Sequence, residues 1–175
     1  RKGIYPSMSF GAKFAKKNDW TIFLGSDDWF SSINSLSFIA NTISNNLQEI
    51  NQKLIICGTQ FINNNNLLRL NNIPNLKFTS NNNLAKLIYF GYVPTHQSLC
   101  FSQDLLKKLM PYSTKYNLAA DADLIFKMLS LKEFNIVFLN KILINIEAGG
   151  LSSKFLFKRL KEVFLIYVNY FKFNF

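Results

Sequence analysis

Apolar and polar positions follow one another along this chain in stretches of two kinds. Between Ser7 and Lys17 the apolar residues recur every three or four positions, which is the spacing of one helix face. The run from Thr21 to Leu24 is instead continuously apolar, which is typical of a buried strand. Helical spacing returns from Ser35 to Ile50, and an apolar run from Leu54 to Thr59 follows it. Two successive helix-then-strand units predict an α/β fold in which helices are layered on a sheet.

The middle of the chain is rich in asparagine. Two asparagine runs, at 63–66 and 81–83, predict turns or loops between short strands. The alternation of elements then resumes. Helices are expected at 84–90, 103–109 and 119–131, and strands at 97–101, 136–139 and 142–146.

The composition is that of a folded domain. The chain has 175 residues, of which 49% are hydrophobic and 15% aromatic, so it can bury a sizeable core and is too apolar for disorder. Cys57 and Cys100 each lie in an apolar stretch, which favours buried, reduced thiols over a disulfide. No apolar run approaches the roughly 18 residues of a membrane span, and no cleavable leader is recognisable. We therefore expect a cytoplasmic protein.

A net charge of +10 raises the question of a nucleic-acid partner. The lysines are divided among several predicted helices, and the sequence carries no RNA- or DNA-binding motif. We expect no nucleic-acid partner.

The segment 154–175 combines helical spacing of apolar residues with basic residues near its start. Two interpretations are open: a terminal helix packed on the domain with a solvated basic face, or a helix that lies on anionic lipid. We therefore divide the chain into a main domain, 1–153, and a basic, aromatic amphipathic helix, 154–175.

Two adjacent carboxylates, Asp27 and Asp28, come directly after the predicted strand at 21–24. Open α/β sheets bind ligands at the carboxyl ends of their strands. Carboxylate oxygens suit Mg²⁺ or Mn²⁺, so the pair is a candidate metal site. In the alternative interpretation, Ser26 or Asp27 caps a helix that begins near Trp29.

Three other positions are candidates for chemistry, and each has a structural alternative. Asp121 and Asp123 open a predicted helix, where acids also serve as caps and favour the helix dipole. His96 is the only histidine, and a solitary histidine commonly has a structural hydrogen bond. Tyr5 can contact a ligand or be buried at the approach to a helix.

In order and spacing these motifs resemble the inverting glycosyltransferases of family 2, which have the GT-A fold. The resemblance spans roughly residues 3 to 153 and implies a GT-A-like, Rossmann-like mixed sheet flanked by helices. The matching segments are Gly3-Ile4-Tyr5 with Met8, Ser26-Asp27-Asp28 after a strand, Thr95-His96-Gln97-Ser98, the segment from Tyr116 to Leu124, and the segment from Gly149 to Ser153.

The resemblance implies transfer of a sugar, with inversion, from a nucleotide-sugar donor to a glycan or lipid-linked acceptor, as in cell-surface polysaccharide biosynthesis. Asp28 would hold Mg²⁺ or Mn²⁺, Asp27 would contact the metal or the nucleotide ribose, and Asp121 would be the catalytic base. Tyr5 and His96 would contact the donor. A lipid-linked acceptor would also imply peripheral contact with the inner face of the membrane.

The chain departs from the family pattern at several positions. Lys2, Pro6, Ser7 and Ser9 stand where family members carry acids, alanine or asparagine, and Lys127 stands where an arginine is common. The family's first strand and nucleotide-base loop have no counterpart before the first residue. We therefore expect a fold that is incomplete at its amino terminus. The alternative function is that of a truncated or degenerate homologue without catalysis.

Overall fold

The protein is built on a seven-stranded mixed sheet. The computed structural model describes residues 3–45, 52–71, 73–74, 78–131, 134–149 and 154–171. The strand order is β1-β6-β3-β7-β2, with β4 added beside β3 and β5 beside β7. Strands β3 and β7 run parallel, and every other pair in the described chain is antiparallel. The strands are β1 (Trp20–Ile22), β2 (Trp29–Phe30), β3 (Gln52–Asn63), β4 (Asn66–Asn71), β5 (Phe78–Ser80), β6 (Leu99–Ser102) and β7 (Asn135–Glu147).

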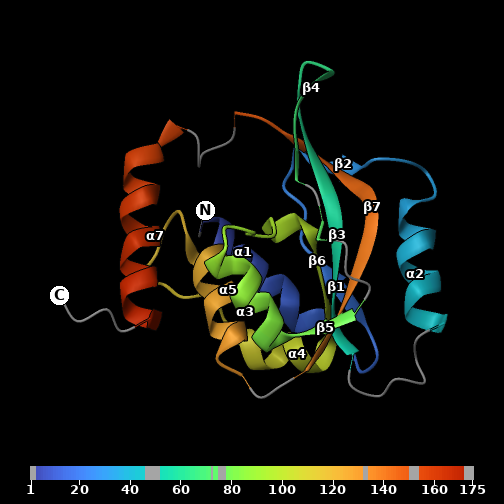
Figure 1. Cartoon of the computed structure of the whole chain (residues 1–175), viewed down its shortest axis with the longest axis horizontal. Helices are drawn as coiled ribbons and strands as arrows, with labels where there is room; N and C mark the ends of the chain where they lie inside the picture. The colour runs from blue at the N-terminus through green and yellow to red at the C-terminus, as the bar shows by residue number, and fades with distance from the viewer. Residues whose placement is uncertain are drawn as a thin grey trace.

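Helices cover both faces of this sheet. Helix α2 lies on one side, helices α1, α3, α4 and α5 lie on the other, and α7 packs against α5 (Figure 1). The predicted α/β fold with a mixed sheet flanked by helices is therefore confirmed. The helices are α1 (Ile4–Gly11), α2 (Ser35–Asn45), α3 (Asn81–Tyr89), α4 (Gln103–Leu109), α5 (Ala120–Leu129) and α7 (Leu156–Phe171), with short 3₁₀ helices at Ala12–Phe14 and His96–Ser98.

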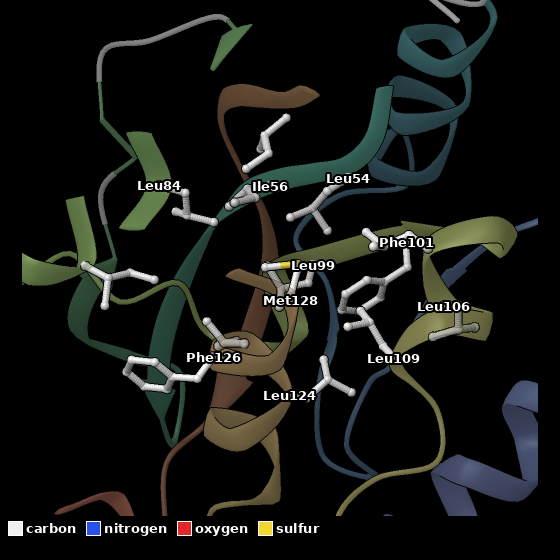
Figure 2. Packing of buried hydrophobic residues seen from close by; sticks show 14 of the residues in the cluster. Leu54, Ile56, Leu84, Leu99, Phe101, Leu106, Leu109, Leu124, Phe126 and Met128 are labelled. Atoms are coloured by element: carbon white, nitrogen blue, oxygen red, sulfur yellow. The ribbon is translucent and has the colours of Figure 1, made fainter. Parts of the chain in front are cut away.

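Strand β3 divides the core into two clusters, because successive side chains of a strand point to opposite faces. Leu54 and Ile56 pack toward α3, α4 and α5, while Ile55 and Cys57 pack toward Ile39 of α2. Figure 2 shows the first cluster, in which side chains of β3 and β6 meet those of α4 and α5. Its labelled members include Leu54, Ile56, Leu99, Phe101, Leu106, Leu109, Leu124 and Met128.

Both cysteines are free and buried, as their apolar surroundings predicted. They lie on the face of the sheet that α2 covers. The thiol of Cys57 approaches the carbonyl oxygen of Ser98 at 3.5 Å.

The two asparagine runs behave differently. Asn64 and Asn65 form the turn between β3 and β4 with φ angles of 47° and 66°, which asparagine adopts more readily than most residues. The turn predicted at 63–66 is therefore confirmed. The turn predicted at 81–83 is wrong, because these residues begin α3. The N–H of Asn83 donates to the hydroxyl of Ser80 at 3.4 Å, which makes Ser80 the N-cap.

Strand β1 differs from its prediction as a buried strand. Its side chains are only half-buried, because it lies at the end of the sheet order and pairs with β6 alone. The strands predicted at 136–139 and 142–146 form one strand, β7, with an irregular register against β3. The helix predicted at 35–50 is observed to Asn45, and the remainder lies outside the described residues.

We predict that Gly58→Ala destabilises the fold. A Cβ at Gly58 would lie 2.7 Å from Ile142 Cδ1 and 3.0 Å from the carbonyl oxygen of Lys141, so β3 and β7 would have to separate. The expected cost is about 1–3 kcal/mol, which lowers the melting temperature by about 2–10 °C in a chain of this size.

Gly11→Ala is the matched control for this measurement. Gly11 has a helical φ of −58° and no heavy atom within 4 Å of an added Cβ, so its melting temperature should stay the same or rise slightly. Thermal unfolding followed by circular dichroism compares the two variants. Equal melting temperatures would contradict a tight contact between β3 and β7.

Candidate active site

The carboxylate of Asp28 is fixed just beyond the end of β1. Its Oδ2 accepts hydrogen bonds from the N–H of Gly25 at 2.8 Å and from Nε2 of Gln97 at 3.0 Å. A Cβ at position 25 would lie 2.7 Å from this oxygen, so a side chain there would displace the Asp28 carboxylate. Gln97 is near because β1 and β6 are antiparallel with Ile22 opposite Cys100, which places the residues after β1 beside those before β6.

The neighbouring carboxylate, Asp27, is exposed. Its Oδ1 accepts a hydrogen bond from the hydroxyl of Ser26 at 3.2 Å. The chain continues from this turn into strand β2 at Trp29, so the alternative that Ser26 or Asp27 caps a helix there is wrong. Both carboxylates therefore lie on a strand-to-strand turn.

His96 lies in a buried aromatic cluster beside this turn. Its side chain is only 7% exposed, and its Nε2 shares a hydrogen bond with the hydroxyl of Tyr112. The imidazole stacks on Phe23 with ring centroids 5.6 Å apart. Burial lowers the pKa of His96, and the negative charge of Asp121 opposes this change less strongly. The ring is therefore neutral near pH 7 and has one N–H to donate.

The second candidate carboxylate, Asp121, lies in the first turn of α5. Its Oδ1 accepts a hydrogen bond from the hydroxyl of Tyr5 at 3.1 Å, across 116 positions of sequence. Tyr5 is carried by α1, which follows Gly3 in a left-handed conformation (φ 89°) that favours glycine. Burial, and then the charge of Asp121, raise the pKa of Tyr5. Its hydroxyl stays protonated and remains a donor.

These contacts form one continuous row of side chains. Asp28 binds Gln97, the adjacent His96 binds Tyr112, and the ring of Tyr112 lies 5.4 Å from that of Tyr5, which binds Asp121. The structure thus brings Tyr5, His96, Asp28 and Asp121 into one region, with Asp27 at its exposed edge.

The sequence interpretation missed three residues here as site residues: Gln97 and Tyr112 of the row, and Phe23, which stacks on His96. Gln97 directly follows His96 in a matching motif, which is a signal that could have identified it. Tyr112 is reached only through the fold, since its position depends on the chain after α4, where its N–H donates to the hydroxyl of Ser9 at 3.1 Å. Phe23 appears in the sequence only as part of an apolar run.

Asp123 and Lys127 also lie at positions of the family pattern, and their contacts in the structure are with other parts of the chain. Burial raises the pKa of the Asp123 carboxyl, although the charges of Lys127 and Lys115 act in the opposite direction. Nζ of Lys127 donates to the carbonyl oxygen of Leu109 at 2.6 Å. Lys127 therefore holds the end of α4 in this structure.

The fit of a divalent cation depends on Asp27 and Asp28. In the part of the chain that the structure describes, no three His, Cys, Asp or Glu side chains come together as a metal cage. Mg²⁺ is commonly held by one or two carboxylates, with substrate phosphates and waters as the other ligands. Oδ1 of Asp28 has no hydrogen bond to another described residue, and Asp27 is exposed. The two carboxylates therefore leave oxygens open to a cation.

The fold is GT-A-like, with a mixed sheet flanked by helices. The chain is similar to TarS of S. aureus, as seen in two crystal structures of TarS residues 1–349, one of them in complex with UDP. The complex matches with a TM-score of 0.63 and 14% identity over 97% of this chain and 46% of the TarS chain. The other structure matches with a TM-score of 0.63 and 15% identity over 96% and 46%.

The present chain therefore spans less than half of the TarS chain, and at this identity the similarity establishes the fold alone. No protein-family model and no curated protein sequence matches the chain. Among the helices that the structure describes, none is both long and apolar enough to cross a membrane.

We predict that His96 makes folding stability depend on pH. Its pKa is lowered in the folded state, so the unfolded chain, where the pKa is 6.5, binds the extra proton as the pH falls. Stability from this source is present above about pH 6.5 and is lost below it, by up to about 1.4 kcal/mol per pH unit.

His96→Gln removes this proton while keeping a polar partner for Tyr112. Urea unfolding between about pH 7.5 and about pH 5.5 should show the wild type losing its stability advantage over the variant. A difference between the two proteins that stays constant with pH would contradict a neutral, buried His96.

Proposed function

We propose that this chain transfers a sugar from a nucleotide-sugar donor to an acceptor hydroxyl, with inversion, as family 2 glycosyltransferases do. The observation that carries the proposal is the row of contacts that links Asp28, at the end of β1, with Asp121, at the start of α5. One carboxylate is suited to the donor and the other to the acceptor. The structural similarity to TarS supports this assignment.

The donor is proposed to bind at the turn that carries Asp27 and Asp28. Because the similar TarS structure is a complex with UDP, we propose a uridine diphosphate sugar. Mg²⁺ or Mn²⁺, when bound, would offset the negative charge that the departing diphosphate acquires. Gln97 and Gly25 orient the Asp28 carboxylate by occupying its Oδ2, which leaves Oδ1 for the metal. A contact of His96 with the donor stays a prediction.

The acceptor hydroxyl is proposed to lose its proton to Asp121 as it attacks. The acceptor oxygen forms a bond to the anomeric carbon while the bond from that carbon to the nucleotide's phosphate oxygen breaks, and the electron pair leaves with the nucleotide. Attack from the opposite face inverts the carbon. The hydrogen bond from Tyr5 occupies Oδ1 of Asp121, and Oδ2 has no hydrogen bond to another described residue, so it can take the proton.

The acceptor is proposed to be a glycan or a lipid-linked sugar of a cell-surface polysaccharide. Helix α7 offers one observation that favours work at a membrane surface. Its Glu162 and Ile166 are buried against the domain. Its opposite side carries Phe157, Leu160 and Phe164, which are 88%, 54% and 58% exposed.

Lysines border this apolar stripe. Lys154, Lys158 and Lys161 are exposed on the adjacent side of the same helix segment. An apolar stripe beside a row of cations complements a bilayer of anionic lipid. We therefore propose that α7 rests on the inner face of the membrane and keeps the site near a lipid-linked acceptor.

We predict that UDP binds this chain in the presence of Mn²⁺ and that Asp28→Ala weakens this binding at least about tenfold, because the variant loses a metal ligand. Isothermal titration calorimetry measures both affinities. Asp104→Ala is the control, since Asp104 is exposed on α4 and pairs with Lys53 at 3.1 Å.

Asp121→Asn should bind UDP normally and lower sugar transfer by about 10²–10⁴-fold, because it cannot accept the acceptor's proton. Failure of the folded wild type to bind UDP or other nucleotides with Mn²⁺ would contradict the proposed function. The chain would then be a degenerate homologue without catalysis.

We predict that the chain sediments with vesicles of anionic lipid and not with vesicles of neutral lipid. Phe157→Ser with Phe164→Ser should abolish sedimentation, and Lys158→Gln with Lys161→Gln should weaken it by about 2 kcal/mol at low salt. Equal sedimentation with both lipids would contradict the role of charge. Self-association of the free chain, lost in the Phe157/Phe164 variant, would assign the stripe to a second copy.

A further inference from the structure

Helix α7 also reaches the start of α5 through a buried carboxylate. Glu162 is 8% exposed and accepts three backbone hydrogen bonds. Its Oε1 lies 3.3 Å from the N–H of Asn117, and its Oε2 lies 2.8 Å from that of Leu118 and 3.0 Å from that of Ala119. These three amides belong to the segment that leads directly into α5.

This contact fixes the segment before α5, whose N-cap residue provides no capping side chain. Ala119 is the N-cap residue and has no side-chain oxygen to accept a hydrogen bond from the first turn. The amides at the start of a helix need such partners when they are buried, as that of Ala119 is. Glu162 meets this need for the amide of Ala119, from 43 positions away in the sequence.

Asp121 lies two residues beyond the clamped segment, in the first turn of α5. Its side chain is held by Tyr5, and its backbone follows from where the helix begins. We infer that Glu162 is a positioning residue for Asp121, because it fixes the start of α5 and thereby the place of the carboxylate. The inference rests on the proposed function, in which Asp121 is the base.

The role of Glu162 can be separated from the attachment of α7 to the domain. The later turns of α7 are attached by aromatic packing, with the ring of Phe126 of α5 lying 5.0 Å from that of Tyr167 and 5.5 Å from that of Tyr170. Loss of Glu162 would therefore release residues 117–119 while α7 stays attached. Arg159, one turn before Glu162, lies close enough to Tyr5 for its charge to oppose the rise in the pKa of that tyrosine. Helix α7 thus lies beside both supports of Asp121.

The test compares Glu162→Ala and Glu162→Gln with Asn169→Ala, an exposed residue of the same helix that lies outside the proposed membrane stripe. Glu162→Ala should lower kcat at least about tenfold and leave the KM for the UDP-sugar within about twofold, because the donor end of the row is untouched. Glu162→Gln should restore part of kcat, since its amide oxygen still accepts hydrogen bonds. Asn169→Ala should match the wild type.

Amide hydrogen exchange provides a readout that is independent of turnover. In Glu162→Ala, exchange at residues 117–120 should accelerate at least about tenfold, while residues 163–170 of α7 keep their protection. Should Glu162→Ala fail to fold, Glu162→Gln carries the same comparison, since it preserves the size of the side chain.

An unchanged kcat in Glu162→Ala, with an active wild type, would overturn the inference and leave the proposed function standing. Loss of protection along all of α7 would also overturn it, because the effect would then be general loosening. A wild type that binds no UDP and transfers no sugar would overturn the proposed function, and the inference with it.

Discussion

The parallel pairing of β3 with β7 is the constraint on which the rest of the structure depends. Both faces of β3 are buried, so its alternate side chains form one core with α3, α4 and α5 and a second core with α2. Because β6 pairs with β3 and β1 pairs with β6, the position of β1 follows from this ladder. The turn that carries Asp28 therefore has its place set by backbone pairing that starts in the centre of the sheet.

The two ends of the candidate site are positioned by different physical means. Asp28 is held by a turn and a neighbouring 3₁₀ helix at the edge of the sheet, where hydrogen bonds to Gly25 and Gln97 fix one oxygen. Asp121 is held by helices, through Tyr5 of α1 and the clamp that Glu162 of α7 places on the start of α5. The distance between donor and acceptor ends thus depends on how the helices pack on the sheet.

Local patterns predicted much of the fold, because the apolar face of a helix and the apolar run of a buried strand depend only on residues that are close in the sequence. The helix predicted at 103–109 coincides with α4, and motif order placed Asp28, His96 and Asp121 in one region. The contacts that orient these side chains could not be predicted from the sequence. The bond from Tyr5 to Asp121 spans 116 positions, and the bonds of Glu162 span up to 45, distances over which no periodicity carries information. The extent of β7 depended likewise on its partner β3, not on its own sequence.

The reactivity of the two buried cysteines reports on local opening of the native protein. Burial raises the pKa of both thiols to about 12, so almost none of the reactive thiolate is present at neutral pH while the sheet is closed. A thiol reagent can modify Cys57 or Cys100 only in molecules whose sheet has parted from α2. The rate at which a reagent modifies these thiols therefore measures how often this part of the native protein opens, and no cysteine has to be introduced for the measurement.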